Sequence, residues 1–300
     1  MIKIANAPCS WGALEFDLQG KAATYDIVLD EMQRSGYSGT ELGDWGFMPT
    51  DPAVLKAELA QRSLTLLGAF VPVALKEESQ HAAGVEAALK VARLLAAVEG
   101  TTPLIVLADD NGKVPERTLN AGRVTSEMGL TDDQWKVFAA GVDRIAAEVK
   151  KETGLRLVVH HHCAGYAETP EEIEKLLALT NPALVGLCLD TGHYQFAGGD
   201  PLAFLKKQGK RVWHMHFKDC HPGIAAQSRK EGWDYFTSVG KGVFCELGKG
   251  AVDFPAVAKQ LDAQGFNGWI VVEQDVLPGM GKPKDSAQRN RDYLRSIGYK

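Results

Sequence analysis

The most constraining feature of this sequence is the regular alternation of short apolar runs with longer segments of helical periodicity. The apolar runs predict eight strands, at residues 2–5, 39–42, 64–70, 103–107, 155–160, 184–190, 211–217 and 269–273. Helical patterns follow them at residues 22–35, 52–62, 77–98, 132–152, 170–179, 201–207, 254–264 and 287–297. Because strands that alternate with helices are parallel and joined by right-handed crossovers, eight such units predict an α/β fold, a single (β/α)8 TIM barrel over residues 1–300. An open doubly wound sheet is the alternative.

Local signals support several of these helix boundaries and exclude two common binding motifs. Asp51, Thr131 and Thr169 each stand directly before a helical pattern, where their side chains can cap the first turn. No GxGxxG follows the first strand, and no GxxxxGK[ST] occurs in the sequence. The sequence therefore predicts neither a dinucleotide site nor a P-loop.

Composition and charge argue against several classes of partner. The formal net charge is -5, and the basic residues are scattered, so no nucleic-acid partner is expected. No apolar run approaches the roughly 20 residues that a membrane span needs, and no signal peptide is recognisable. The five cysteines form no CxxC pair and are expected to be reduced, which predicts a cytoplasmic protein.

Two long connections are predicted to lie over the same end of the barrel. They span residues 108–130 and 220–252, and each follows a strand. Connections of this length in a compact domain are usually lids or binding loops. Because the loops after barrel strands surround the carboxyl ends of those strands, where barrel enzymes keep their active sites, both are predicted to be active-site loops.

Ligand-type side chains gather at the ends of the last four predicted strands. They are His160, His161 and His162; Asp190 and His193; His214, His216, Lys218 and Asp219; and Glu273 and Asp275. Strand ends converge near the axis of a closed barrel, and imidazole and carboxylate groups together suit a Mn, Co, Fe or Zn ion. One ligand from each strand would leave coordination positions open for a substrate, as in catalytic metal sites.

Each of these residues also has a purely structural interpretation. Since side chains alternate along a strand, His160 and His162 share one face, and His161 is expected to point outward as a hydrogen-bonded residue. Asp190 can cap the following turn. Cys163 and Cys188 could be ligands, although a small buried hydrophobe is the commoner role. Trp11, Trp45 and Trp233 could contact a sugar-like ligand or pack the loops.

Three strand endings carry a resemblance to a known superfamily. Asp-Thr-Gly-His (190–193), His-Met-His-Phe-Lys-Asp (214–219) and Val-Val-Glu-Gln-Asp (271–275) resemble the xylose-isomerase-like sugar isomerases, epimerases and dehydratases. Within that superfamily, the opening Asn-Ala-Pro-Cys-Ser-Trp-Gly, the segment 36–52 and the run Val-Val-His-His-His resemble the inosose dehydratase family.

The resemblance implies a divalent metal, Mn or Co, held by one residue from each of strands five to eight. The superfamily pattern Glu, Asp, His, Glu places its last three ligands on Asp190, His216 and Glu273. His160 occupies the place of the first Glu, and His162 or water is the alternative fourth ligand. The missing Glu argues against an isomerase that shuttles a proton between two paired carboxylates.

The implied reaction is the metal-dependent loss of water from a keto-cyclitol, scyllo-inosose, to a trihydroxycyclohexane-1,2-dione in inositol catabolism. We expect His193 to act as acid or base, Lys218 to stabilise the enolate, and Glu41 to orient hydroxyls or act as base. The residues expected to bind substrate are Asn6, Trp11, His162 and Asp219. A keto-sugar isomerase or epimerase is the alternative function. An endonuclease-type hydrolase and a sugar-binding protein are less favoured, and a homo-oligomer is possible.

Overall fold

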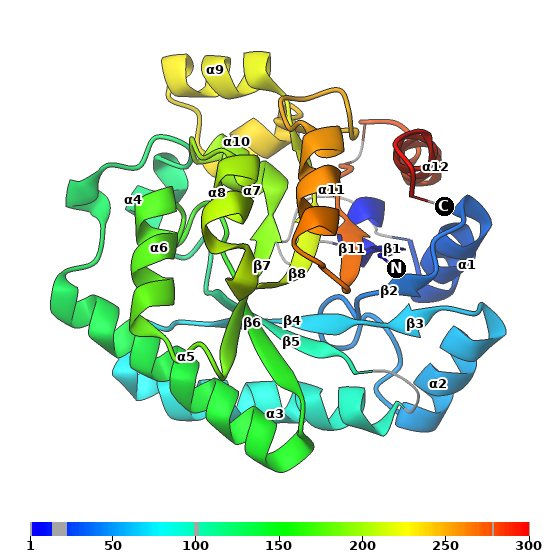
Figure 1. The fold of residues 1–300 in the computed structure, drawn as a ribbon, viewed down its shortest axis with the longest axis horizontal. Helices are drawn as coiled ribbons and strands as arrows, with labels where there is room; N and C mark the ends of the chain where they lie inside the picture. The colour runs from blue at the N-terminus through cyan, green and yellow to red at the C-terminus, as the bar shows by residue number, and fades with distance from the viewer. Residues whose placement is uncertain (1, 14–22, 99–101, 278, 300) are drawn as a thin grey trace.

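Nine strand segments form one sheet that closes into a barrel. The computed structural model describes residues 2–13, 23–98, 102–277 and 279–299. Its strand order is β3-β2-β1-β11-β8-β7-β6-β5-β4, and every neighbouring pair is parallel (Figure 1). The segments are β1 (Lys3–Asn6), β2 (Gly39–Thr40), β3 (Thr65–Leu66), β4 (Gly68–Val73), β5 (Leu104–Asp109), β6 (Arg156–His160), β7 (Val185–Asp190), β8 (Val212–Phe217) and β11 (Trp269–Val272).

The ring closes at Leu67, between β3 and β4. The backbone N–H of Leu67 donates to the carbonyl of Thr40 at 3.0 Å, and its own carbonyl accepts from the N–H of Leu104 at 2.8 Å. Leu67 thus joins β2 on one side to β5 on the other, and β3 and β4 act as one interrupted strand. The sheet therefore has eight strand positions, and the predicted barrel is confirmed over the open sheet.

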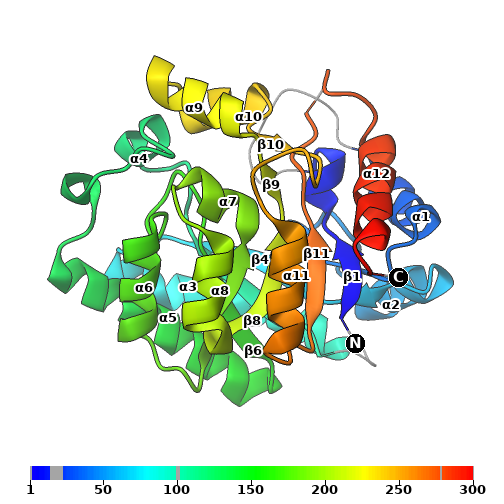
Figure 2. The ribbon, with the colours of Figure 1, turned by 45° about the horizontal axis from the view of Figure 1, so that its top comes forward.

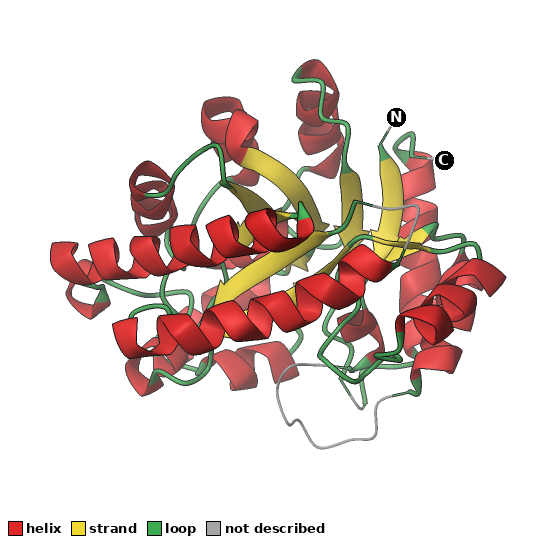
Figure 3. Ribbon diagram, turned by 90° about the horizontal axis from the view of Figure 1, so that it is seen from below, coloured by secondary structure: helices red, strands yellow, loops and turns green. Residues whose placement is uncertain are grey.

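Helices surround the barrel, as Figure 3 shows from below. Their bounds are α1 (Tyr25–Ser35), α2 (Pro52–Gln61), α3 (His81–Ala97), α5 (Asp132–Thr153), α6 (Pro170–Leu179), α8 (Pro201–Gln208), α11 (Phe254–Ala263) and α12 (Pro283–Ser296). The three predicted caps are confirmed, because the side chains of Asp51, Thr131 and Thr169 accept backbone N–H groups at the starts of α2, α5 and α6. Ala22, the expected start of the first helix, lies outside the described residues.

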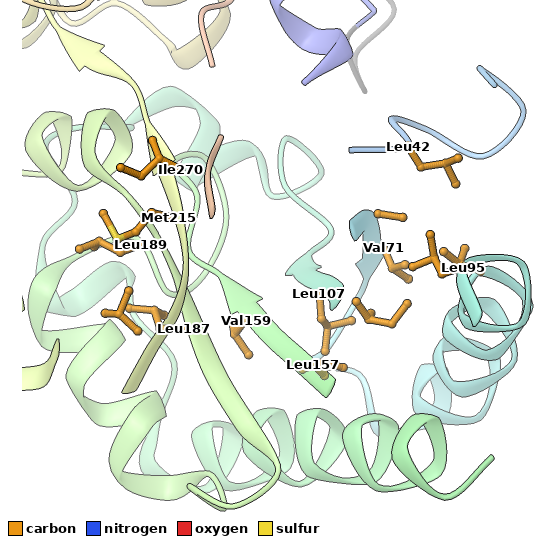
Figure 4. Packing of buried hydrophobic residues seen from close by; sticks show 14 of the residues in the cluster. Leu42, Val71, Leu95, Leu107, Leu157, Val159, Leu187, Leu189, Met215 and Ile270 are labelled. Atoms are coloured by element: carbon orange, nitrogen blue, oxygen red, sulfur yellow. The ribbon is translucent and has the colours of Figure 1, made fainter. Parts of the chain in front are cut away.

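The apolar core lies between the barrel and its helices. Outward side chains of the strands pack there against helix residues such as Leu95 of α3 (Figure 4). These outward residues include Val71, Leu107, Val159 and Leu189. Inside the barrel, small clusters fill the lower part, one of them formed by Leu104, Val106, Val158 and Cys188. Alternate residues of each strand therefore belong to different environments, as the two-residue period of a strand requires.

The two predicted long loops contain secondary structure that the sequence pattern did not reveal. The first carries α4 (Pro115–Leu119), and the second carries α9 (Pro222–Glu231) and α10 (Tyr235–Gly240). The remaining short elements are β9 (Asp219–Cys220), β10 (Phe244–Cys245), α7 (Thr191–Phe196) and the 3-10 turns Pro8–Trp11, Glu78–Gln80, Ser126–Met128 and Gly209–Arg211. Figure 2 shows α9 and α10 beyond the carboxyl ends of the strands. The sequence pattern did not reveal α4, α7 and α10 because helices of five or six residues span less than two turns, too few to repeat an apolar stripe.

All five cysteines are free thiols. Among the described helices, none combines the length and apolarity that crossing a membrane requires.

Candidate active site

Four buried side chains converge at the carboxyl ends of neighbouring strands. His160 ends β6, Asp190 ends β7, His216 lies near the end of β8, and Glu273 directly follows β11. Their ligand-type atoms all lie within 4.8 Å of one another. The register explains this convergence, because Asp190 pairs with His216 and His216 pairs with Val271, two residues before Glu273. Side chains at these paired positions share the inner face of the barrel.

The separations within this cluster are close to those of a metal site. Nδ1 of His216 lies 3.2 Å from Oε1 of Glu273 and 3.9 Å from Oδ2 of Asp190. Nε2 of His160 lies 3.8 Å from the same oxygen of Asp190. Ligand atoms about 2.1 Å from an ion lie roughly 3–3.5 Å apart in tetrahedral or octahedral geometry, so a small contraction would suffice.

Asp190 has one oxygen engaged and one available. Its Oδ1 accepts the backbone N–H groups of Gly192 and His193 at 2.8 and 2.9 Å, which caps α7. Its buried Oδ2 has no hydrogen-bond partner within the described part of the chain. The capping role of Asp190 is therefore confirmed, and the cap fixes the carboxylate so that Oδ2 points into the cluster, where it is available to a cation.

His216 likewise has one ring nitrogen engaged and one available. Its Nε2 lies 2.8 Å from Oε1 of Glu41, and Nε2 of His214 lies 2.7 Å from the same oxygen. If Nε2 of His216 carries the proton of the neutral ring, Nδ1 keeps a lone pair, and that atom is buried without a hydrogen-bond partner among the described residues. A carboxylate that accepts from one ring nitrogen and leaves the other free is the usual arrangement behind a metal-binding histidine. These two unpartnered atoms fit a cation.

Of the two histidines considered for the fourth position, His160 has the fitting geometry. The ring of His162 is engaged elsewhere: its Nδ1 lies 2.5 Å from the carbonyl of Cys163, and its Nε2 lies 3.3 Å from the hydroxyl of Tyr235. His161 points away from both, and its Nε2 accepts the backbone N–H of Asp190 at 3.1 Å. That contact agrees with the hydrogen-bonded role expected for His161.

A buried lysine and a second carboxylate stand beside the cluster. Nζ of Lys218 lies 3.2 Å from Oε2 of Glu273, 3.4 Å from Oδ2 of Asp275 and 3.4 Å from Nε2 of His193. Burial disfavours the ammonium, but the surrounding carboxylates outweigh it and raise the pKa of Lys218 above its usual range. Burial raises the pKa of Asp275, and the lysine charge opposes that effect. Lys218 is therefore a cation, and Asp275 accepts hydrogen bonds from it.

Glu41 reaches the site from the end of β2. Burial acts to raise the pKa of its carboxyl, but His216 and His214 lower it to about 2. The carboxylate is therefore ionised and engaged with two imidazoles. A group with so low a pKa is a poor base, which leaves orientation of His216 and of substrate hydroxyls as the roles that the geometry permits.

A cavity that is partly open to solvent lies over the cluster. His160, His216 and Glu273 line it together with Lys218 and Asp275. The remaining lining residues are Ala7, Pro8, Cys9, Ala13, Glu41, Gly43, Asp44, Phe70, His162, Tyr235, Phe236 and Val239. Tyr235, Phe236 and Val239 come from α10, so this helix forms one wall of the cavity.

The 108–130 loop supports the site from outside instead of lining it. Arg117 of α4 is fully buried and donates to both oxygens of Glu172, at 2.9 and 2.6 Å. Nη1 of Arg123 donates to the carbonyl of Trp233, just before α10, at 2.7 Å. The described part of this loop contacts the lid segment, residues 220–252, and supplies none of the residues that line the cavity, so its role as an active-site loop stays a prediction.

Three residues expected to bind substrate lie elsewhere. Asn6 pairs with Val272 and shares its outward face, so its side chain is on the helix side of the barrel. Asp219 also points away from the axis, and its oxygens accept backbone N–H groups of Cys220, Gly248, Gly250 and Val252 at 2.9–3.1 Å. The indole N–H of Trp11 donates to Glu31 at 2.7 Å, and the ring packs in the core. None of these three side chains is among the residues that line the cavity in the described chain, whereas His162 is.

His193 lies behind the cavity wall. It is 1% exposed and packs on the rings of His162 and Phe244, at centroid distances of 3.9 and 4.7 Å. Burial and the neighbouring His162 and Lys218 hold its pKa well below the usual range, so the ring is neutral. His193 is not among the residues that line the cavity in the described chain, which argues against direct acid or base chemistry on a substrate. Its contact with Lys218 is that of a positioning residue.

Sequence reasoning missed several residues of the site. Asp275 and His214 were noticed at strand ends but were assigned no role, although their two-residue spacing from Glu273 and His216 placed them on the inner face. No pattern in the sequence pointed to Tyr235 or Phe70. Trp45 and Trp233, which the sequence offered as possible sugar contacts, each lie beside a lysine. Nζ of Lys90 lies 4.2 Å from the ring centroid of Trp45, and Nζ of Lys241 lies 5.9 Å from that of Trp233.

Comparisons with known proteins agree with this arrangement. A family model described as xylose isomerase-like TIM barrel matches residues 29–297. An inosose dehydratase of Geobacillus kaustophilus (strain HTA426) is 32% identical over 294 residues, covering 97% of this chain and 93% of the relative. An inosose dehydratase of Lacticaseibacillus casei is 30% identical over 293 residues, covering 98% and 96%.

Solved structures share the fold at lower identity. The probable 3-DHS dehydratase of Bacillus anthracis superposes with a TM-score of 0.72 at 12% identity, covering 98% of this chain and 99% of that one. An L-ribulose 3-epimerase superposes with a TM-score of 0.71 at 15% identity, covering 99% and 94%. At such identities the likeness concerns the fold alone.

Fold and site together define a (β/α)8 barrel with a candidate metal centre at the carboxyl ends of its strands. The chain belongs to the xylose isomerase-like TIM barrel family, and within it to the group of inosose dehydratases that it matches over nearly its whole length.

Proposed function

We propose that this protein is a metal-dependent dehydratase that removes water from scyllo-inosose, giving a trihydroxycyclohexane-1,2-dione in inositol catabolism. One observation carries the proposal: four donor atoms meet under a cavity whose wall also holds an ammonium and a carboxylate, Lys218 and Asp275. The relatives at 30–32% identity are inosose dehydratases, which favours this substrate.

The proposed ligands are His160, Asp190, His216 and Glu273, and the proposed ion is Mn or Co. Two imidazoles and two carboxylates form a mixed nitrogen and oxygen set that suits such borderline cations. When bound, the ion would supply Lewis-acid stabilisation of negative charge at the ketone oxygen.

Asp275 is the proposed base. Its carboxylate lines the cavity, is held by Lys218 and is not among the four proposed ligands. An elimination breaks one C–H bond beside the ketone and one C–O bond at the next carbon, and it forms a C=C bond between these two carbons. The enol so formed tautomerises to the dione, and the proton and the hydroxyl leave as water. Asp275 would take that proton, and the Lys218 ammonium would stabilise the oxygen on which negative charge develops.

Substrate hydroxyls need polar partners on the other walls. The carboxylates of Glu41 and Asp44 supply acceptors there, and Tyr235 and His162, which contact each other, line the wall beside them. His193 is proposed to hold Lys218 in place from behind. Apolar residues such as Phe70 and Val239 complete the wall and exclude water from the reacting atoms.

The test uses metal-stripped protein and scyllo-inosose, with and without added Mn²⁺ or Co²⁺, followed by mass spectrometry and absorbance. We expect a product lighter by one water that forms only after metal is restored. Asp275→Asn should bind metal like the wild type but lose turnover, which separates the base from the ligands. Metal-dependent conversion at constant mass would overturn the dehydratase assignment in favour of an isomerase or epimerase.

A further inference from the structure

A fully buried thiol lies directly beneath the four-residue cluster. Cys188 of β7 precedes Asp190 by two residues, so both side chains point into the barrel, Cys188 one layer lower. Its register partners are His160 on β6 and His214 on β8. The sulfur of Cys188 and one ring nitrogen each of His160 and His216 lie within 4.8 Å of one another.

Each imidazole of this lower group has one buried nitrogen, Nδ1 in both rings, without a hydrogen-bond partner among the described residues. Nδ1 of His216 is the atom that also lies 3.2 Å from Oε1 of Glu273, so the upper and lower groups compete for it. Buried polar atoms without partners are uncommon in folded proteins, and an ion is one of the recognised reasons for them. His160 and His216 are 4% and 2% exposed, so water from the cavity does not readily satisfy these atoms.

A third group of candidate ligands, Glu41, His214 and His216, does not qualify. Both imidazoles approach the same oxygen of Glu41, at 2.7 and 2.8 Å, which is hydrogen-bond distance. Two N–H donors already satisfy that oxygen, so a cation there would have to displace them.

The donor atoms of the upper and lower groups differ in chemical softness. The upper group offers two nitrogens and two carboxylate oxygens, which suit Mn²⁺. The lower group offers two nitrogens and one sulfur, a set that favours Zn²⁺ over Mn²⁺. Because His160 and His216 belong to both groups, one ion bound below prevents another from binding above.

We propose that His160, Cys188 and His216 form a second, zinc-selective site beneath the catalytic cluster. Zn²⁺ bound there would hold Cys188 as a thiolate, its proton having passed to solvent, and would draw both imidazoles away from Asp190 and Glu273. Cys188 is not among the residues that line the cavity in the described chain, so the ion would present no open position to a substrate. Zinc is therefore an inhibitory ion. This consequence rests on the proposed function only in taking the upper group as the catalytic one.

The direct test is zinc-edge X-ray absorption on the wild-type protein loaded with one equivalent of Zn²⁺. We expect one sulfur scatterer at about 2.3 Å together with nitrogen ligands. Wild-type protein loaded with Mn²⁺ should show nitrogen and oxygen ligands without sulfur. A zinc spectrum that contains no sulfur overturns the proposal, whatever the behaviour of any variant.

Competition binding adds a comparison between matched variants. Cys188→Ser should lower the affinity for Zn²⁺ by more than about tenfold, because even residues that only hydrogen-bond to a metal ligand contribute at least that much. The affinity for Mn²⁺ should stay unchanged. Cys220→Ser is the control, because Cys220 is equally buried but lies outside the donor group. Equal loss of zinc affinity in both variants would contradict a specific role for Cys188.

This experiment also separates the inference from the proposed function. If Mn²⁺ restores water loss but zinc has no sulfur ligand, only the inference fails. If zinc has a sulfur ligand but Mn²⁺ restores no water loss, the lower site stands and the dehydratase assignment fails.

Discussion

The inner and outer faces of the same barrel strands hold opposite kinds of residue. Asp190 points inward to the site, whereas its neighbour Leu189 points outward to the helices and packs in the main apolar core. His216 and Met215 divide in the same way. One residue of displacement along a strand thus separates a charged centre from a hydrophobic layer, because successive side chains alternate between faces.

The comparison also explains which polar residues serve the site. Lys218 continues the inner series after His216 and lines the cavity, but Asp219, one residue later, turns outward and binds four backbone N–H groups of the lid segment. A polar residue at a strand end therefore faces the cavity or turns away from it according to the parity of its position. Three experiments test this division, and a fourth concerns a buried carboxyl outside the barrel.

The largest expected effect comes from the inner face at Asp190. In Asp190→Asn, the amide oxygen can still cap α7, while an NH2 group takes the place of the Oδ2 that faces the cluster. We expect a loss of Mn²⁺ affinity of at least about 100-fold and a comparable loss of metal-dependent activity, with little change in folding. Isothermal titration calorimetry and circular dichroism measure the two quantities. Unchanged metal affinity would remove Asp190 from the ligand set.

The matched change on the outer face is Leu189→Ala. Leu189 is fully buried among core residues, so truncation leaves a cavity and should lower the free energy of unfolding by about 3 kcal/mol. Urea denaturation followed by fluorescence gives this value. Metal affinity measured on the folded variant should stay within about twofold of the wild type. A large change in metal affinity would show that the two faces are not independent.

Asp219→Ala tests the outward polar residue that the sequence assigned to substrate binding. Removing its carboxylate leaves up to four N–H groups without their acceptor, and we expect a loss of about 2 kcal/mol in stability. Hydrogen exchange should accelerate at Gly248, Gly250 and Val252. If exchange there is unchanged and only the KM for substrate rises, Asp219 binds substrate after all.

A pH dependence of stability is expected from outside the barrel, at Glu168. Burial raises the pKa of this carboxyl from 4.5 to about 7, although the N–H groups of Gly122 and Ala164 and the charge of Arg117 oppose the rise. The folded state therefore holds this proton more tightly than the unfolded state. Between about pH 4.5 and 7, Glu168 should lower stability by at most about 1.4 kcal/mol for each unit of rising pH, with no further loss above that range.

The control is Glu168→Gln, which carries no titrating proton. Stability of the two proteins, measured by urea denaturation at several pH values, should diverge within that window and run parallel above pH 7. Parallel curves over the whole range would contradict the raised pKa of Glu168.

Several features of this protein follow from local sequence alone. The alternation of apolar runs and helical patterns predicted the barrel, and the helix caps at Asp51, Thr131 and Thr169 formed as expected. Both kinds of feature depend on neighbours a few residues apart, since strand period, helix period and capping are local. The grouping of His160, Asp190, His216 and Glu273 needed only one more assumption, closure of the sheet, because strands of a closed barrel bring their ends together.

Tertiary structure alone decided how Asn6 is oriented and what covers the cavity. No ligand-type neighbour on β1 indicates which face Asn6 shares, whereas Asp219 stands one residue after Lys218, and that spacing alone places it on the opposite face. Tyr235 reaches His162 across 73 positions, and Arg117 reaches Glu172 across 55. Such contacts depend on how the lid and loops pack on the finished barrel, and no local periodicity records that packing.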